Sequence, residues 1–313
     1  MAGIGPDIRL LVEHVSQEEL LRHVSILAAS ERSSASAPEA HAKALEYIRG
    51  VFQKANLEIL DHTFLYSGGP GTYSGRSGTN LIGHKVGSEP ELASLLVSAH
   101  YDTVTGSPGA DDNASGVAAL LECARVLDTV RLKRTIEYVI FDMEEEGLVG
   151  STAFVRDEAS STGYDGVYNL EMMVFTSGPG TQRFPPGFDL LFPEVHQHLD
   201  ERGFTSDLLV VTSMSQSAAL GRRMAVEAAS YVPDLDVVSL ELNARMRLPS
   251  DFFRSDHASF WEAEISAVMV TDTANFRNPN YHTAGDTADT LDYGFLHKVT
   301  RVLVATVSGH AQD

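Results

Sequence analysis

Two amphipathic runs open the chain. Apolar residues recur at helical spacing over residues 20–27, and Ser16 stands where the N-cap of that helix is expected. A second run begins at Pro38, a residue that suits the first turn of a helix, and continues to about Lys54. The pattern therefore predicts two N-terminal helices, each with one face turned toward a core.

Short apolar runs follow these helices and are bounded by turn-forming residues. We expect strands at residues 57–66, 80–84, 95–99, 136–141, 167–174, 208–211 and 267–270. Helical spacing returns at residues 117–127, and a C-terminal helix is expected at 291–309. Strands that alternate with helices are typical of a largely parallel sheet. The expected fold class is α/β, with a mostly parallel mixed central sheet covered by helices on both faces.

Two segments rich in glycine, serine or proline interrupt this alternation. Residues 67–78 are expected to form a flexible surface loop. Residues 176–192 are expected to form a long loop near the functional site, because the strand pattern resumes after them. We therefore expect a single domain over residues 1–313, in which residues 1–79 supply the N-terminal helices and the first strand.

The charge balance narrows the range of partners. The chain of 313 residues has 43 acidic and 23 basic residues and a net charge of -20, which argues against nucleic acid or an anionic membrane as a partner. A single cysteine, Cys123, makes an intrachain disulfide impossible. No signal peptide and no membrane-spanning stretch is visible. We expect a cytoplasmic protein, although a secreted chain whose signal has been removed would look the same.

Side chains that bind metals gather near the ends of the expected strands. His100 and Glu144 come just after strands, Glu171 lies within one, and His282 follows one through a loop. Asp112 precedes the helix predicted from residue 117. Each such residue alone is more often structural, but the carboxyl ends of strands in an open α/β sheet converge on one site. Two histidines and several carboxylates together predict a pair of divalent metals with a hydrolytic function.

The sequence around these residues is more specific than their positions. The motifs, in chain order, are Ser98-Ala99-His100-Tyr101-Asp102, Gly109-Ala110-Asp111-Asp112-Asn113-Ala114-Ser115-Gly116, Glu144-Glu145-Glu146-Gly147-Leu148-Val149-Gly150-Ser151, Ser255-Asp256-His257, Asn280-Tyr281-His282-Thr283 and Asp286-Thr287. This series resembles the M28 family of zinc aminopeptidases over residues 80–305. The resemblance implies a zinc-exopeptidase-like (phosphorylase/hydrolase-like) fold, a peptide substrate with a free N-terminus, and two zinc ions that other divalent metals could replace.

The resemblance also implies a role for each ligand. His100 and Glu171 are similar to ligands of one zinc ion, and Glu145 and His282 to ligands of the second. Asp112 resembles the carboxylate that bridges both ions. Many family members have aspartate where this chain has Glu171. Because the glutamate side chain is longer, the resemblance leaves open the distance between the two metals and their occupancy.

Glu144 resembles the general base of the family. A carboxylate beside a water held between two zinc ions can take its proton and later hand it to the leaving amine. Asp102 resembles a carboxylate that fixes the tautomer of the histidine before it. Tyr281 resembles a tyrosine that donates to the oxyanion in some relatives, and plain aromatic packing is an equal alternative.

Three functions remain open from the sequence. The leading hypothesis is a metal-dependent aminopeptidase that hydrolyses the N-terminal peptide bond of peptides through a water bound by two zinc ions, with Glu144 as general base. A glutaminyl-cyclase-like acyltransferase is an alternative, but the intact segment at residues 144–151 favours hydrolysis. A metal-stabilised binding protein without catalysis is the other, and it has no need of a base. Asp256 and His257 are left with either a structural role or a contact to substrate.

Overall fold

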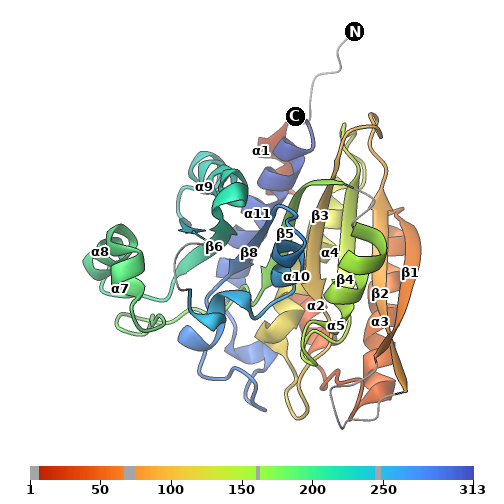
Figure 1. Cartoon of the computed structure of the whole chain (residues 1–313), viewed down its shortest axis with the longest axis horizontal. Coiled ribbons are helices and arrows are strands. Elements are labelled where there is room, and N and C mark those ends of the chain that lie inside the picture. The colour runs from red at the N-terminus through yellow and green to blue at the C-terminus, as the bar shows by residue number, and fades with distance from the viewer. Residues whose placement is uncertain (1–6, 67–74, 160–162, 244–247) are drawn as a thin grey trace.

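One mixed sheet of eight strands forms the centre of the molecule (Figure 1). The computed structural model describes residues 7–66, 75–159, 163–243 and 248–313. The strands lie in the order β1-β2-β4-β3-β5-β8-β6-β7. Their bounds are β1 Glu58–Tyr66, β2 Arg76–Lys85, β3 Ser94–His100, β4 Ile136–Phe141, β5 Tyr164–Glu171, β6 Leu208–Met214, β7 Asp236–Leu242 and β8 Ala267–Thr271.

The middle of this sheet is parallel. β3 pairs in parallel with β4 on one side and with β5 on the other, and β8 continues in the same direction beyond β5. The antiparallel pairs lie toward the two edges and join β1 to β2, β2 to β4, and β8 to β6. Because β3, β4, β5 and β8 share one direction, their carboxyl ends meet at the same edge of the sheet. The predicted mixed, mostly parallel sheet is confirmed.

Helices cover both faces of the sheet because side chains alternate along each strand. On β3, Leu95 and Val97 belong to one core, whereas Leu96 belongs to the core on the opposite face. The first core is covered by α1 Ile8–Glu13, α2 Gln17–Leu27, α3 Pro38–Lys54, α4 Gly116–Leu127, α9 Ala218–Tyr231 and α11 Tyr293–His310. The second is covered by α5 Val149–Phe154, α7 Phe188–Leu191, α8 Pro193–Glu201 and α10 His257–Glu262.

The N-terminal helices belong to the main body of the molecule. α2 begins after Ser16, whose side chain accepts a hydrogen bond from the backbone of Glu19, and α3 begins at Pro38 as predicted. Their buried residues join the same core as those of α4 and α11. Residues outside the expected family region therefore belong to the core on one face of the sheet.

Several predicted strands have other boundaries in the structure, and one of these differences moves a candidate site residue. The strand predicted at residues 167–174 is β5, which begins earlier and ends at Glu171. The next residue, Met172, has a φ of 48°, a left-handed conformation that does not continue a strand. Glu171 therefore lies at the end of its strand rather than within it, level with the other candidate ligands.

The predicted loop at residues 67–78 is also partly wrong. β2 already begins at Arg76, and Gly78 pairs with Phe64 of β1. A Cβ atom at Gly78 would lie 2.3 Å from Cζ of Phe64, so only glycine lets this ring lie flat on the neighbouring strand. Residues 67–74 of the predicted loop lie outside the described residues.

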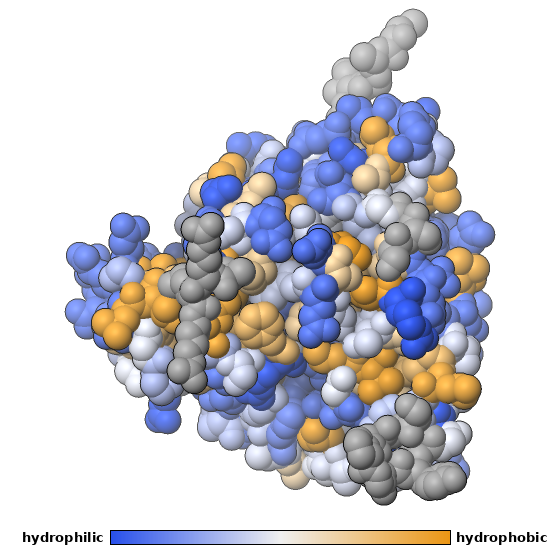
Figure 2. Space-filling model, viewed as in Figure 1, coloured by the Kyte–Doolittle hydropathy of each residue, from blue (hydrophilic) through white to orange (hydrophobic). Residues whose placement is uncertain are grey.

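Hydrophilic residues dominate the visible surface, and apolar residues gather in smaller areas, one of them over α7 and α8 (Figure 2). Within the described ranges, every helix is too short or too polar to cross a bilayer.

The sequence pattern did not predict β7, α8 and α9. These elements form the edge of the sheet beyond β6 and part of its cover.

Candidate metal centre

Four predicted site residues lie at the carboxyl edge of the parallel strands. His100 is the last residue of β3 and Glu171 the last residue of β5, and these two strands are neighbours. Glu144 and Glu145 lie in the turn that follows β4, on the other side of β3. The strand order therefore brings together residues that are far apart in the sequence.

Two further ligands come from connections. Asp112 lies in the irregular turn η1 (Ala110–Ser115) that leads into α4, and His282 lies in the loop between β8 and α11. His282 and Met143, the residue before Glu144, have positive φ angles of 58° and 55°. Such non-glycine conformations cost about 1–3 kcal/mol each and cluster at functional sites.

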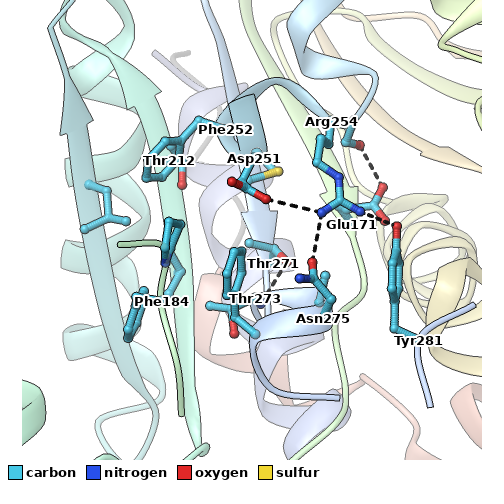
Figure 3. A pocket seen from close by; sticks show the side chains of 17 residues that line it. Glu171, Phe184, Thr212, Asp251, Phe252, Arg254, Thr271, Thr273, Asn275 and Tyr281 are labelled. Carbon is cyan, nitrogen blue, oxygen red and sulfur yellow. Dashed lines mark hydrogen bonds and ion pairs between the residues drawn. The ribbon is translucent and has the colours of Figure 1, made fainter. Parts of the chain in front are cut away.

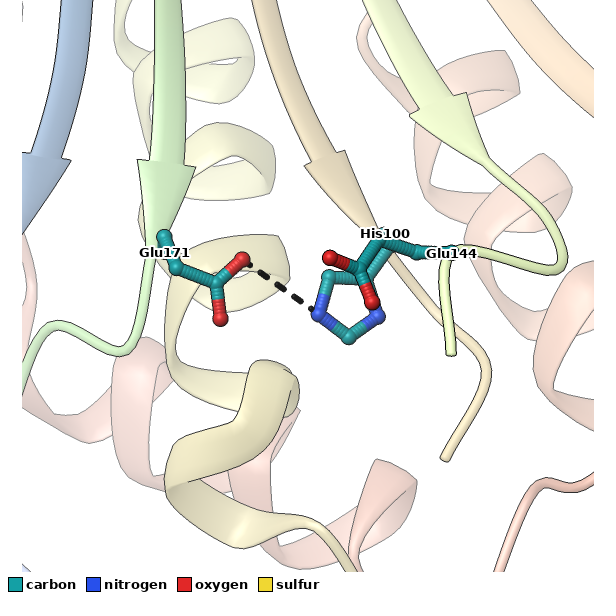
Figure 4. Close-up of side chains that lie close together, drawn as sticks. All are labelled: His100, Glu144 and Glu171. Atoms are coloured by element: carbon teal, nitrogen blue, oxygen red, sulfur yellow. Dashed lines mark ion pairs between the residues drawn. The ribbon is translucent and has the colours of Figure 1, made fainter. Parts of the chain in front are cut away.

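His100, Glu144 and Glu171 form the first ligand group (Figure 4). One ligand atom of each lies within 4.8 Å of the others, and Nε2 of His100 lies 3.5 Å from Oε2 of Glu171. The Ser255 hydroxyl donates a hydrogen bond of 2.7 Å to the same Oε2. This bond holds the longer side chain of Glu171 in place opposite the histidine.

Asp112, Glu145 and His282 form the second ligand group. Nε2 of His282 lies 3.1 Å from Oδ2 of Asp112 and 3.1 Å from Oε2 of Glu145. The other oxygen of Asp112, Oδ1, lies 3.3 Å from Nε2 of His100 in the first group. Asp112 thus stands between the two groups and turns one carboxylate oxygen toward each.

Two further carboxylates hold the backbone that carries the ligands. Asp102 accepts hydrogen bonds of 3.1 Å from the backbone N–H groups of both Glu144 and Glu145, and its Oδ1 lies 3.5 Å from Nδ1 of His100. Asp286 accepts from the backbone N–H groups of Asp111 and Asp112, at 2.9 and 3.1 Å. The ligands are therefore fixed from behind before any metal binds.

Burial and crowding shift the acidity of the site. Burial raises the pKa of Glu144 well above its ordinary value, and burial together with the charge of Asp112 raises the pKa of Glu145 to about 7. Burial opposes ionisation of Asp112, but the neighbouring imidazoles of His100 and His282 hold its pKa below the ordinary value. Burial likewise disfavours the charged form of His282, yet Asp112 and Glu145 raise its pKa to about 9. Buried carboxylates this close together repel one another, so positive charge is required to stabilise their ionised forms.

The donor atoms fit divalent metals. Within the described part of the chain, Nε2 of His100 and Oε1 of Glu145 are buried and have no hydrogen-bond partner. Two imidazoles and four carboxylates are ligands that zinc accepts, and also manganese or cobalt. Coordination to a metal would give these two buried atoms, Nε2 of His100 and Oε1 of Glu145, a partner.

A pocket opens beside the ligand groups (Figure 3). Glu171, Arg254 and Tyr281 line both this pocket and the cleft over the metal ligands. Farther in, the pocket walls are mostly apolar and come from β6, β7, β8 and the loops around them: Phe184, Pro185, Val210, Leu240, Phe252, Met269, Ala274 and Phe276. The apolar wall is continuous with the site and suits a side chain of a bound molecule.

Arg254 and Tyr281 meet at the mouth of this pocket. Nη2 of Arg254 donates a hydrogen bond of 2.6 Å to the Tyr281 hydroxyl, and Nη1 donates one of 3.0 Å to Asn275. The Tyr281 ring stacks on the imidazole of His282, with centroids 3.7 Å apart. An arginine can only donate, so the phenolic hydrogen of Tyr281 stays free to be donated elsewhere.

Three supporting residues were not assigned a role from the sequence. Asp286 and Ser255 lie within the quoted stretches of sequence, so their proximity to a motif is a signal that could have revealed them. Arg254 directly precedes the motif that begins at Ser255, and a basic residue beside this acidic motif is a further signal in the sequence. The acidic neighbour Glu146 points away from the centre and pairs with Arg76 and Ser34.

Asp256 and His257 are buried beneath the site rather than exposed in it. His257 Nε2 lies 2.9 Å from the carbonyl of Phe252, and burial lowers its pKa to about 4. Burial raises the pKa of Asp256 to about 7. Of the two roles left open by the sequence, these positions favour structural support over contact with substrate.

The family model of peptidase family M28 matches residues 80–307. Since this match spans more than half of the chain, the chain belongs to peptidase family M28. The predicted family and the predicted enzyme class, a hydrolase of peptide bonds, are confirmed.

Relatives of this chain carry related names. The uncharacterized protein YfbL of Escherichia coli (strain K12) is 33% identical over 275 residues, which cover 82% of this chain and 76% of that protein. A probable zinc metalloprotease of Pyrenophora teres f. teres (strain 0-1) is 27% identical over 254 residues, 75% of this chain and 52% of that protein. The chain therefore spans only about half the length of this fungal relative.

Solved structures share the fold at low sequence identity. BSAP, a zinc aminopeptidase from Bacillus subtilis, has a TM-score of 0.74 and 17% identity over 96% of both chains. A glutaminyl cyclase from Bacteroides thetaiotaomicron has a TM-score of 0.68 and 16% identity over 94% of this chain and 98% of that one. One fold thus serves both activities, and the likeness to these structures does not choose between them.

Proposed function

We propose that this chain is a zinc-dependent aminopeptidase that uses two zinc ions to remove the N-terminal residue from peptides. The position of Asp112 supports this proposal most strongly, because its two oxygens lie 3.3 and 3.1 Å from two different histidines. With Asp112 shared, His100 and Glu171 complete three ligands for one ion, and Glu145 and His282 complete three for the other. Three protein ligands and an open position are typical of catalytic zinc sites.

Glu144 is the proposed general base. Its carboxylate is close enough to His100 and Glu171 to coordinate, but Asp112 already supplies the third ligand there. When bound, zinc lowers the pKa of water to about 7 and polarises a carbonyl group. Glu144 takes the proton of the attacking water and gives it to the amine as the C–N bond breaks. A carboxylate beside the attacking water is placed to accept this proton and to return it.

The rest of the substrate is held by two kinds of surface. The buried carboxylates attract the free α-amine of a peptide, and the apolar pocket takes the side chain of the first residue. Tyr281 is the proposed donor to the oxyanion, since Arg254 occupies its acceptor side and leaves its hydrogen free. The preferred substrates are therefore peptides with an apolar N-terminal residue. The cytoplasmic location stays a prediction.

Hydrolysis of aminoacyl-anilides tests this function. Leucyl-p-nitroanilide is expected to be cleaved, the activity to be lost with a chelator and restored by zinc, and N-acetylleucyl-p-nitroanilide to be left intact because its α-amine is blocked. Cyclisation of an N-terminal glutamine peptide without hydrolysis would overturn the proposal in favour of acyl transfer. Zinc binding with neither activity would overturn it in favour of a binding protein.

A further inference from the structure

A buried cation beside the metal centre comes from the N-terminal part of the chain. Arg32 lies between α2 and α3, outside the residues 80–307 that the family model matches. Only 1% of its surface is exposed, and it is among the largest fully buried side chains of the described residues. Arginine is almost never buried so completely unless its charge and its N–H groups are satisfied.

The guanidinium of Arg32 is bound by backbone carbonyls. Nε donates to Tyr101 at 2.7 Å, Nη1 donates to Leu27 and Pro108 at 2.7 and 2.6 Å, and Nη2 donates to Gly109 at 2.9 Å. Four carbonyls around one planar group require the fixed geometry of arginine. A lysine offers three donors from a single point and cannot reproduce this arrangement.

Three of these four carbonyls belong to the two segments that carry the candidate metal ligands, and the fourth is that of Leu27 at the end of α2. Tyr101 directly follows His100, and Gly109 lies three residues before Asp112. The backbone N–H of Arg32 also donates a hydrogen bond of 2.7 Å to the hydroxyl of Thr103. One residue of the N-terminal segment therefore ties the His100 segment to the Asp112 segment.

The contact leaves little room for movement. Gly109 has a φ of 62°, and a Cβ atom there would lie 2.2 Å from the carbonyl oxygen of Asp112 and 3.1 Å from Nη2 of Arg32. The packing thus fixes Arg32, Gly109 and the carbonyl of Asp112 against one another. A shift of the guanidinium would be transmitted to the backbone of a bridging ligand.

The charge of Arg32 acts on the same residues. Burial lowers its pKa to about 10, whereas the nearby carboxylates of Asp102 and Asp112 raise it, so the side chain stays charged at neutral pH. The hydrogen bonds of its guanidinium go to carbonyls, and none of the described carboxylates forms a direct ion pair with it. The charge therefore offsets part of the repulsion among the carboxylates before metal binds.

We propose that Arg32 is a positioning residue of the metal centre, which fixes the segments of His100 and Asp112 relative to each other so that metal binds tightly. The inference rests on the proposed function only in requiring that the two ligand groups bind metal. The N-terminal helices then serve the site directly, although they lie outside the family region.

Zinc affinity of an Arg32→Lys variant tests this role without any assay of activity. The zinc dissociation constant, measured by competition with a chromogenic chelator, is expected to rise about 10–100-fold, as for other residues that orient ligands. The matched control is Arg277→Lys. Arg277 is also buried and donates to the carbonyls of Phe175 and Leu208, neither of which adjoins a ligand. The control is expected to lose thermal stability but to keep its zinc affinity within about twofold of the original chain.

A second variant keeps the test decisive if Arg32→Lys does not fold. Thr103→Val removes the hydroxyl that binds the backbone of Arg32 while keeping the shape of the side chain. It is expected to weaken zinc binding in the same direction and to alter the visible absorption of the cobalt-substituted protein, which reports ligand geometry. Unchanged zinc affinity in the folded variants, or equal losses in the Arg277→Lys control, would overturn the inference. Failure of the original chain to bind zinc would instead overturn the proposed function.

Discussion

The metal centre and the apolar pocket share Glu171, Arg254 and Tyr281, yet they are built differently. In the metal centre each ligand is fixed by another group, as Asp102 fixes the turn of Glu144. The inner wall of the pocket is mostly apolar, and its side chains contribute chiefly the volume that they leave open. Catalytic activity should therefore be lost when a single atom of the metal centre is changed. Substrate preference should instead change gradually with the volume of the side chains that line the pocket.

The largest effect is expected in the metal centre from Glu144→Gln. The amide keeps the shape of the side chain but cannot take a proton, so kcat should fall by about 10³-fold or more. General acid–base catalysis typically contributes about 10²–10⁴-fold to the rate. Metal analysis should still find the zinc content of the original chain, because Glu144 is not needed as a ligand. Steady-state kinetics with leucyl-p-nitroanilide measure the effect.

The neighbouring Glu146→Gln is a matched control for this change. Glu146 pairs with Arg76 and Ser34 outside the centre, so its variant should keep nearly full activity. If Glu144→Gln retained most of its activity, or lost its zinc, the assignment of the base would be wrong.

Most of the candidate metal centre could be proposed from the sequence because metal binding restricts residue type. Only a few side chains bind zinc, and the parallel strands bring their ends together, so His100, Asp112 and Glu145 could be read from motifs next to predicted elements. The prediction failed on geometry that no motif encodes. The left-handed Met172 ended β5 at Glu171, and the register of β2 placed Gly78 inside a strand.

The pocket and the buried Arg32 could not be predicted in this way. Apolar residues such as Met269 on β8 and Phe184 in the loop after β5 are compatible with any core, and only the pairing of β8 with β5 and β6 brings Met269 to the pocket. Arg32 binds carbonyls, which every residue has, so its partners leave no trace in the sequence. Side-chain motifs reveal chemistry, whereas shape and backbone contacts become visible only in the fold.

A smaller effect is expected in the pocket from Met269→Trp. Met269 lies on β8 and lines the pocket, so the larger indole takes up space meant for the substrate side chain. The ratio of kcat/KM for phenylalanyl to alanyl anilides should fall about 10–100-fold, the scale of discrimination by apolar volume. The alanyl substrate is the internal control and should be cleaved at nearly the original rate. A parallel loss with both substrates would place the effect in the metal centre and remove the pocket from specificity.

The smallest effect concerns stability and depends on the buried carboxylates that the metal centre concentrates and the mostly apolar pocket wall does not. In the metal-free protein the pKa of Glu145 is raised from 4.5 to about 7 and that of His282 from 6.5 to about 9. In the folded state Glu145 therefore holds extra protons between pH 4.5 and about 7, and His282 between pH 6.5 and about 9, so raising the pH through these two windows favours unfolding. Zinc replaces these protons, so its stabilising effect should grow with pH.

Thermal unfolding with zinc and with a chelator at pH 5 and pH 8 measures this difference. The gap in Tm between the two forms should widen by a few degrees at pH 8, since about 1 kcal/mol shifts Tm by about 2–4 °C in larger domains. Buried histidines outside the centre, such as His23 and His257, have lowered pKa values near 4 and titrate in both forms, so their contribution cancels in the gap. A gap that stays constant or narrows would mean that protons and zinc do not compete for the same side chains. Glu145 and His282 would then have to be replaced as ligands.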